Sequence, residues 1–374
     1  MATSQQINQA GDYQLDVIEI ISYRRHGAEQ KPYTMDIKPI TLNVELTEDI
    51  FTSTMNGAIT VYDSQDIRTV LPITGLEKLN LRFNTPGMRG INAVQEEGYP
   101  FQIYKIDEVR PDDNAPNSQL YKIYFCSVEA FKNTQCRISR AYTGTFEDAI
   151  EDIFRGKDKL NSKKNLFFEP TRNNSKYVIP SLRPFGAINL LANNALSANY
   201  ANSGYHFYET PDGFHFRSIE SMLAMGGAKA RPSKFKFTSQ IANTREGEVK
   251  DVNTDMRNVI KYDFLRPVDS LNLMRRGAYA NKMITHDALN KVIKTTTFDY
   301  ADSFGNYFHT EHNDGDKATD KHTLPWSKYE DYSTYADSKL MVASDTRQIH
   351  ENYEFPTKET TIQQSLPQLE HVRS

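Results

Sequence analysis

Gly57-Ala-Ile-Thr-Val-Tyr-Asp63 and Leu71-Pro-Ile-Thr-Gly-Leu-Glu-Lys-Leu-Asn-Leu-Arg-Phe83 are the two stretches that decide the fold class. In the first stretch, and from Lys78 onward in the second, apolar and polar residues alternate at every second position. Successive side chains of a β-strand point to opposite faces, so each stretch has one apolar and one polar face. Both stretches therefore predict half-buried strands, joined by a polar loop.

The same two-residue period recurs on both sides of this unit. It predicts further strands at Tyr13–Ile21, with a bulge near Val17 or Ile18, and at Ile40–Leu46, Phe101–Val109 and Leu120–Phe131. The last two strands are separated by Arg110–Ser118, whose prolines and asparagines are expected to end the ladder as a turn-rich loop. These segments are enough to close an antiparallel barrel or sandwich.

Beyond this region the period changes to the 3.6 residues of a helix. Thr145-Phe-Glu-Asp148 has the form of a capping box and predicts an amphipathic helix that ends before Gly156. A second helix is expected from Pro184 to the region before Gly204. Between them, the basic run Arg155–Lys164 is interpreted as a solvated loop, because no glycine-rich phosphate turn accompanies it.

Tyr205–Phe216 predicts a hairpin of two aromatic-rich strands around a turn at Pro211, Asp212 and Gly213. Strand patterns return later and predict a second β domain. They occur at Phe235/Phe237, Ile260/Tyr262/Phe264 and Thr296/Phe298/Tyr300. The polar segment from Ala301 to about Ser344 carries seven aromatic residues and is expected to be irregular and to pack on another surface.

Composition limits the possible functions. The 374 residues favour two domains, and a net charge of −4 from 44 basic and 48 acidic residues gives no general attraction to nucleic acid. Cys126 and Cys136 form no C-x-x-C pair, and Cys126 is expected to be a buried free thiol. The chain contains no apolar run of membrane-spanning length, and its first residues lack the pattern of a signal peptide, so no membrane insertion is expected.

The sequence offers no recognisable catalytic motif. The region from His309-Thr-Glu-His312 to His322 is rich in histidine and carboxylate, but its spacing matches neither a zincin helix nor an EF-hand loop, so a hydrated loop is favoured over an ion site. No nucleophile elbow, P-loop or dinucleotide fingerprint occurs. We therefore assign no catalytic, metal-binding or cofactor-binding residue and expect a protein that is not an enzyme.

Several segments resemble, in a consistent order, the central hub proteins of the baseplates of contractile-tailed bacteriophages of the T-even type. They are the unit at 57–83, the strands at 99–106 and 121–133, the segments at 137–150, 175–192 and 204–222, and a looser match at 258–287. The resemblance extends roughly from Tyr13 to Tyr300 and is specific in its order more than in any one motif.

The resemblance implies a β-rich α+β fold with two β-barrel domains similar to tail-tube subunits and a helix-containing insertion between them. The implied division is a first barrel at 1–135, an insertion at 136–203, a hairpin at 204–234 that returns to the first barrel or the insertion, a second barrel with the irregular aromatic segment at 235–355, and a flexible tail at 356–374.

The family further implies a homotrimeric hub that joins the sixfold tail tube to the threefold central spike. Three copies with two barrels each would form a ring of six similar barrels. The implied partners are the spike protein, a tail tube or tube-initiator protein, and baseplate wedge proteins, while DNA passes through the lumen without specific binding. The implied location is the virion tail baseplate, after assembly in the host cytoplasm.

Two alternatives stay open. The first is the hub of another contractile injection system or of a noncontractile phage tail. The second is a tail-associated peptidoglycan hydrolase, which would need a pair of carboxylic acids at a suitable distance that sequence alone does not reveal.

The loop Ser64–Gly75 is the candidate for a contact between protomers. Leu71, Pro72, Ile73 and Gly75 are the residues expected to make it. The alternative is that this loop only caps its own barrel.

Overall fold

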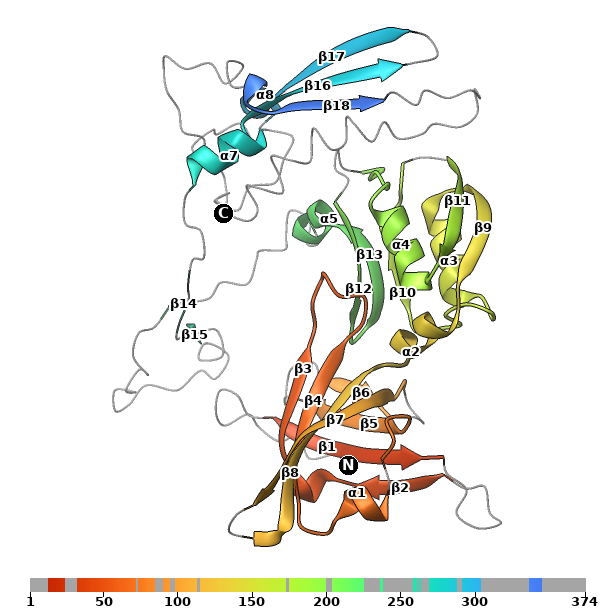
Figure 1. The fold of residues 1–374 in the computed structure, drawn as a ribbon, viewed down its shortest axis with the longest axis vertical. Coiled ribbons are helices and arrows are strands. Elements are labelled where there is room, and N and C mark those ends of the chain that lie inside the picture. Colours follow the sequence, from red (N-terminus) through yellow and green to blue (C-terminus); the bar gives the residue numbers. More distant parts are fainter. Residues whose placement is uncertain are drawn as a thin grey trace, which may run out of the picture.

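The protein is described here by a computed structural model. Its described residues are 13–23, 32–71, 73–84, 90–94, 98–112, 115–172, 175–199, 204–224, 236–237, 258–259, 261, 263, 269–287, 291–303 and 336–344. Over these residues the chain is rich in β-structure, with several sheets and short helices (Figure 1).

Eight strands near the N-terminus form one sheet with the order β2-β1-β5-β7-β8-β4-β3, and β6 pairs with β5. The strands are β1 (Gln14–Ser22), β2 (Tyr33–Asp36), β3 (Thr41–Thr47), β4 (Asn56–Asp63), β5 (Lys78–Asn84), β6 (Ile91–Ala93), β7 (Phe101–Asp112) and β8 (Ala115–Ser127). Their apolar faces enclose one core that includes Ile20, Ile59, Leu79 and Phe125. A 3-10 turn, Lys38–Ile40, and a short helix, α1 (Ile67–Val70), connect strands of this sheet.

The predicted strands at 57–63 and 78–83 are confirmed as β4 and β5, but they are not neighbours. β7 and β8 lie between them in the sheet, and α1 lies in the connection. The expected irregularity in the first strand is confirmed by a register shift between Leu15 and Val17. Over the described residues the sheet is not closed into a barrel, because its order begins at the four-residue strand β2 and ends at β3.

Two local predictions in this region are wrong. The loop expected at Arg110–Ser118 is mostly strand, since β7 continues through Pro111 to Asp112 and β8 begins at Ala115. Register shifts between Asp107 and Arg110 and between Pro111 and Asp112 explain this, because a bulge accommodates a proline that cannot donate to a regular ladder. The strand expected to reach Phe131 ends at Ser127, and α2 (Val128–Gln135) follows it.

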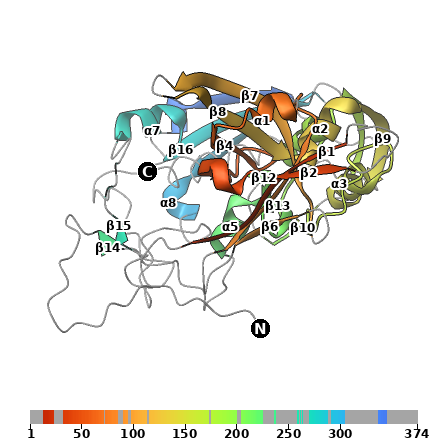
Figure 2. The ribbon, with the colours of Figure 1, turned by 90° about the horizontal axis from the view of Figure 1, so that it is seen from below.

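The residues that follow α2 in the chain form a second core. It is built by α3 (Phe146–Arg155) and α4 (Pro184–Ala192), the pair β9 (Ile138–Gly144) and β11 (Ser175–Leu182), and a three-stranded sheet of β10 (Leu166–Phe168), β13 (Gly213–Ser218) and β12 (Tyr205–Thr210), followed by α5 (Ile219–Ala224). We call the part from β1 to α2 the sheet module and the part from β9 to α5 the inserted module. In Figure 1 the inserted module lies above the sheet module, and Figure 2 shows the same elements from below.

In the inserted module, most of the elements predicted from the sequence are present. The capping box is present, because Thr145 accepts from the N–H of Asp148 and the Asp148 carboxylate accepts from the N–H of Thr145. The predicted hairpin is confirmed as β12 and β13, and β13 pairs in parallel with β10 of the 136–203 segment. The second helix is shorter than expected, since α4 ends at Ala192, well before Gly204.

The C-terminal part contains a small sheet of β17 (Val292–Asp299), β16 (Ala280–Asp287) and β18 (Leu340–Ser344), with α7 (Ser270–Arg276) and α8 (Tyr300–Ser303). β14 (Lys236–Phe237) and β15 (Asn258–Val259) form a separate short pair. The expected second barrel is therefore not seen as a closed sheet among the described residues. The expected strand at Ile260/Tyr262/Phe264, the aromatic residues from Phe304 to Tyr335 and the tail at 356–374 lie outside the described residues.

In the part of the chain that the structure describes, no helix is long and apolar enough to cross a membrane.

Gly57 tests the packing of the first sheet. A Cβ atom at this position would lie 2.3 Å from the carbonyl oxygen of Glu45 and 2.5 Å from Cζ of Phe125. We expect Gly57→Ala to lower the free energy of unfolding by about 1–3 kcal/mol, because backbone and core must shift to admit the methyl group. Urea denaturation followed by circular dichroism measures this change.

Gly186→Ala is the matched control. Its added Cβ would meet only Cβ of Leu182 at 3.9 Å, and alanine in a helix is more favourable than glycine by about 0.5–1 kcal/mol. Equal effects of the two substitutions would contradict the packing described for β3, β4 and β8.

Candidate functional site

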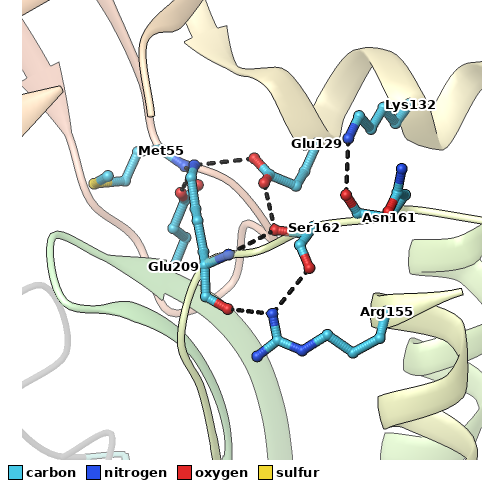
Figure 3. A network of polar contacts seen from close by, with 8 residues as sticks. Met55, Glu129, Lys132, Arg155, Asn161, Ser162 and Glu209 are labelled. Carbon is cyan, nitrogen blue, oxygen red and sulfur yellow. Dashed lines mark hydrogen bonds and ion pairs between the residues drawn. The ribbon is translucent and has the colours of Figure 1, made fainter. Parts of the chain in front are cut away.

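The most concentrated set of buried charges lies where the two modules meet. Nζ of Lys164 is 2.9 Å from Oε2 of Glu129 and 2.6 Å from Oε1 of Glu209. The hydroxyl of Ser162 donates to the other oxygen of Glu129 at 2.6 Å, and the N–H of Met55 donates to the other oxygen of Glu209 at 2.9 Å. We call these five residues the charged junction (Figure 3).

The charged junction crosses the boundary between modules in both directions. Glu129 lies in the first turn of α2, and Met55 directly precedes β4, so both belong to the sheet module. Lys164 precedes β10, and Glu209 lies on β12, so both belong to the inserted module. Each carboxylate therefore binds a donor from the opposite module.

Two basic side chains hold the segment that carries Lys164 by donating to its backbone carbonyl oxygens. Arg155, the last residue of α3, donates through one guanidinium nitrogen to the carbonyl oxygens of Ser162 and Lys164 at 2.9 and 2.6 Å. The ammonium of Lys132 donates to the carbonyl oxygen of Asn161 at 3.0 Å. These contacts hold the backbone at Asn161, Ser162 and Lys164, and Figure 3 shows Arg155 and Lys132 on either side of Ser162.

Burial makes these interactions consequential. Glu129, Glu209 and Lys164 are only 3%, 2% and 9% exposed. Burial raises the pKa of both carboxyl groups; at Glu129 the charge of Lys164 and the hydrogen bonds from Ser162 and Lys164 outweigh it, and the pKa is lowered. At Glu209 burial prevails, with the negative charge of Glu129 adding to it, and the pKa is raised. Burial alone would lower the pKa of Lys164, but the two carboxylates raise it.

The interpretation of Arg155–Lys164 as a solvated loop is wrong for Lys164. Its neighbour Lys163 is exposed, as that interpretation requires, whereas Lys164 turns inward. The sequence carried one usable signal, because Glu209 has the same parity on β12 as the buried Tyr205 and Phe207 and so falls on the apolar face. A carboxylate at such a position needs a buried partner.

One further contact joins the β3–β4 connection to the hairpin. The ring of Phe51 meets the ring of His206 edge to face, with centroids 5.3 Å apart. Burial and the negative charge of Asp212 raise the pKa of Glu48. The same stretch that ends in Met55 thus approaches β12 and its turn at several points.

A pocket of about 240 Å³ adjoins the charged junction. Its lining comes from β6 and the start of β7 on one side and from the β12–β13 turn on the other, and it includes Tyr99, Lys164, Glu209 and Asp212. Nζ of Lys164 lies 5.9 Å from the centre of the Tyr99 ring and 5.6 Å from that of Phe214. The ammonium is therefore surrounded by two carboxylates and two aromatic faces, an arrangement that stabilises the cation where it stands.

The candidate contact loop has a different internal anchor. The Glu77 carboxylate accepts hydrogen bonds from the N–H groups of Thr74, Gly75 and Leu76 and from the hydroxyl of Thr74. Burial would raise the pKa of Glu77, but these hydrogen bonds lower it. Gly75 has φ of +87°, which suits glycine at this tight turn.

Of the four residues expected to contact another protomer, Leu71 is 1% exposed and lies in the core of its own sheet, and Ile73 packs against that core. Pro72 lies outside the described residues. Beside them, Val70 and Leu76 are 63% and 69% exposed. A contact with a second chain by this loop stays a prediction, and Val70 within the loop and Leu76 directly after it are exposed apolar side chains that could contribute to it.

Metal binding and cysteine chemistry can be judged only for the described residues. Among them, no group of three or more histidine, cysteine, aspartate or glutamate side chains could hold a metal ion, and the His309–His322 region lies outside them. Cys126 and Cys136 are both free, and burial raises the pKa of Cys126 to about 12, so its thiol stays protonated at neutral pH.

Comparisons with known proteins give low similarities. No protein-family model matches the chain, and no curated protein matches it. Among solved structures, a tail protein from Neisseria meningitidis MC58 matches with a TM-score of 0.45 and 8% identity over 94% of this chain and 74% of that one. The 43 kDa tail protein of prophage MuSo2 from Shewanella oneidensis matches with a TM-score of 0.41 and 9% identity over 96% and 79%.

A third structure is the E. coli c3393 protein, described as a component of the type VI secretion system with structural similarity to the T4 tail proteins gp27 and gp5. It matches with a TM-score of 0.28 and 12% identity over 55% of this chain and 46% of that one. Because all three TM-scores lie below 0.5, these likenesses by themselves carry no inference about this chain.

Lys164→Met tests the charged junction. The substitution leaves two carboxylates buried without their cation, and removing one partner of a buried ion pair costs about 3–5 kcal/mol. We expect a loss of that size in the free energy of unfolding at neutral pH, measured by urea denaturation. Lys163→Met is the control at the exposed neighbour, and a similar loss in both variants would show that Lys164 has no special role.

Proposed function

We propose that this chain is a structural protein of a phage-like tail, acting as the baseplate hub. In this role it forms a homotrimer that joins the sixfold tail tube to the threefold central spike and encloses the channel for DNA. The proposal rests on the ordered resemblance of the sequence segments. The observation that carries it is that the strands of the segments at 57–127 belong to one sheet, whereas the segments at 137–222 fold into a separate helix-containing module.

The charged junction supports a structural role for this protein. The buried ion pair of Lys164 with Glu129 joins one module to the other, and both carboxylates accept from donors of the opposite module. These polar contacts fix the relative orientation of the two cores. A fixed orientation suits a structural protein that connects neighbouring proteins of a tail. The further partners in this proposal are the spike protein, a tail tube or tube-initiator protein, and the baseplate wedge.

Mass photometry of the purified chain, with and without the spike protein of the same particle, tests the proposal. A monomer has a mass of 42.9 kDa, so we expect a species of about three times this mass without the spike protein, or a heavier complex that contains three copies with it. A persistently monomeric species in both conditions would overturn the proposed ring.

A zymogram on bacterial cell walls tests the hydrolase alternative, since clearing that disappears on substitution of a carboxylate would favour an enzyme.

Leu76→Asp tests the loop contact between protomers. Leu76 is 69% exposed, so a charge there leaves the core intact while it opposes burial against another chain. We expect the variant to keep its far-ultraviolet circular dichroism spectrum and to shift the mass distribution toward monomers. Leu76 directly follows the loop Ser64–Gly75, and Leu271→Asp, at an exposed leucine on α7, is the control. Unchanged assembly of Leu76→Asp would rule this contact out.

A further inference from the structure

The charged junction holds an unequal number of charges. Two carboxylates, Glu129 and Glu209, share one ammonium, that of Lys164, and all three side chains are nearly inaccessible to solvent. With both acids ionised, this cluster carries a net charge of about −1 in a medium where an uncompensated charge is strongly disfavoured. One bound proton would make the cluster neutral.

The surroundings do not supply the missing positive charge directly. The guanidinium of Arg155 points to carbonyl oxygens of the same loop, and its side chain reaches solvent. Lys163, on the rim of the adjoining pocket, is exposed. On the other elements packed here, Asp212 lines the adjoining pocket, and the thiol of Cys126 on β8 lies within reach of the charges of Glu129, Glu209 and Lys164.

We propose that the charged junction is a proton-binding joint, which takes up one proton between neutral and mildly acidic pH and thereby strengthens the contact between the sheet module and the inserted module. This inference is independent of the proposed tail function, because it rests on the charge count and the geometry of the cluster and on no family resemblance.

Glu209 is the site of the proton. Its Oε1 accepts from Lys164 and its Oε2 accepts from the N–H of Met55, and each oxygen keeps a second lone pair. The buried hydroxyl of Ser127 lies beside this carboxyl group: as a donor to the ionised form it lowers the pKa of Glu209, and because a hydroxyl also accepts, it can rotate to accept from the protonated form. A protonated Glu209 can therefore donate to Ser127 while it still accepts from the inserted and the sheet module.

The sign of the pH dependence follows from the two acids. The pKa of Glu209 is raised above its ordinary value of 4.5, so its contribution to stability is fully present below pH 4.5 and is lost as the pH rises through the folded-state pKa. The pKa of Glu129 is lowered, so its contribution is present above pH 4.5 and is lost as the pH falls through the lower folded-state value. The joint is strongest in the mildly acidic window between them.

His206 acts in the opposite direction. Burial lowers its pKa below 6.5, so acidification costs stability at the Phe51–His206 contact. On the adjacent strand, burial and the charge of Arg217 likewise lower the pKa of His215. The total stability of the protein therefore does not isolate the joint. A comparison of two variants at each pH removes these shared contributions.

The test is a urea denaturation series of the wild type and Glu209→Gln from pH 8 to pH 5. The glutamine side chain of the variant binds no proton, so only the wild type gains stability at this position as the pH falls. We expect the ratio of the unfolding constants, variant over wild type, to rise at least about threefold from pH 8 to pH 5, because each unit of raised pKa corresponds to tenfold. Glu151→Gln, at an exposed acid on α3, is the control and should leave its ratio unchanged.

A ratio for Glu209→Gln that stays constant or falls over this range would overturn the inference. If the variant does not fold, infrared difference spectra of the wild-type protein between pH 8 and pH 5 replace it. The expected result is a growing carbonyl band of a protonated, buried carboxylic acid. The absence of that band would equally overturn the proton-binding joint.

Discussion

A single buried ammonium holds the arrangement of this protein together. Lys164 could not remain charged inside the structure without acceptors, and its two acceptors come from different modules, Glu129 from the end of the first sheet and Glu209 from the hairpin. Buried charge needs close, well-directed partners, whereas apolar contact tolerates sliding. The position of Lys164 therefore fixes how the two modules face each other.

The two hydrophobic cores could not achieve this by themselves. One core is enclosed by the eight-stranded sheet and the other by α3, α4 and the aromatic strands of the hairpin, and their buried residues form separate clusters. Apolar burial stabilises each cluster but carries little directional information. The contacts between the modules are instead polar or aromatic, at Met55, Glu209 and the Phe51–His206 pair. This division explains how stable modules can meet through a boundary that responds to protons.

Local patterns specified most elements of the first two modules. The alternation in β4 and β5, the capping box at Thr145 and the aromatic hairpin were all predictable, because each depends on neighbours within a few residues. Errors arose where tertiary context overrode local preference. Bulges carried β7 past Pro111, and Val128 began a helix where the apolar pattern continued the strand. The closed barrels expected from the family resemblance also depended on pairings that no local pattern specifies.

The sequence by itself determined most of the strands and helices of the two modules, and which face of such a strand is apolar, since side-chain periodicity records those choices directly. Only the tertiary structure decided the order of the strands, with β7 and β8 between β4 and β5. It also decided which of the two lysines at 163 and 164 is buried. These adjacent residues have the same chemistry, yet one is solvated and one is buried. The difference comes from Glu129 and Glu209, which lie 35 and 45 residues from Lys164 along the chain and are brought to it only by the tertiary structure.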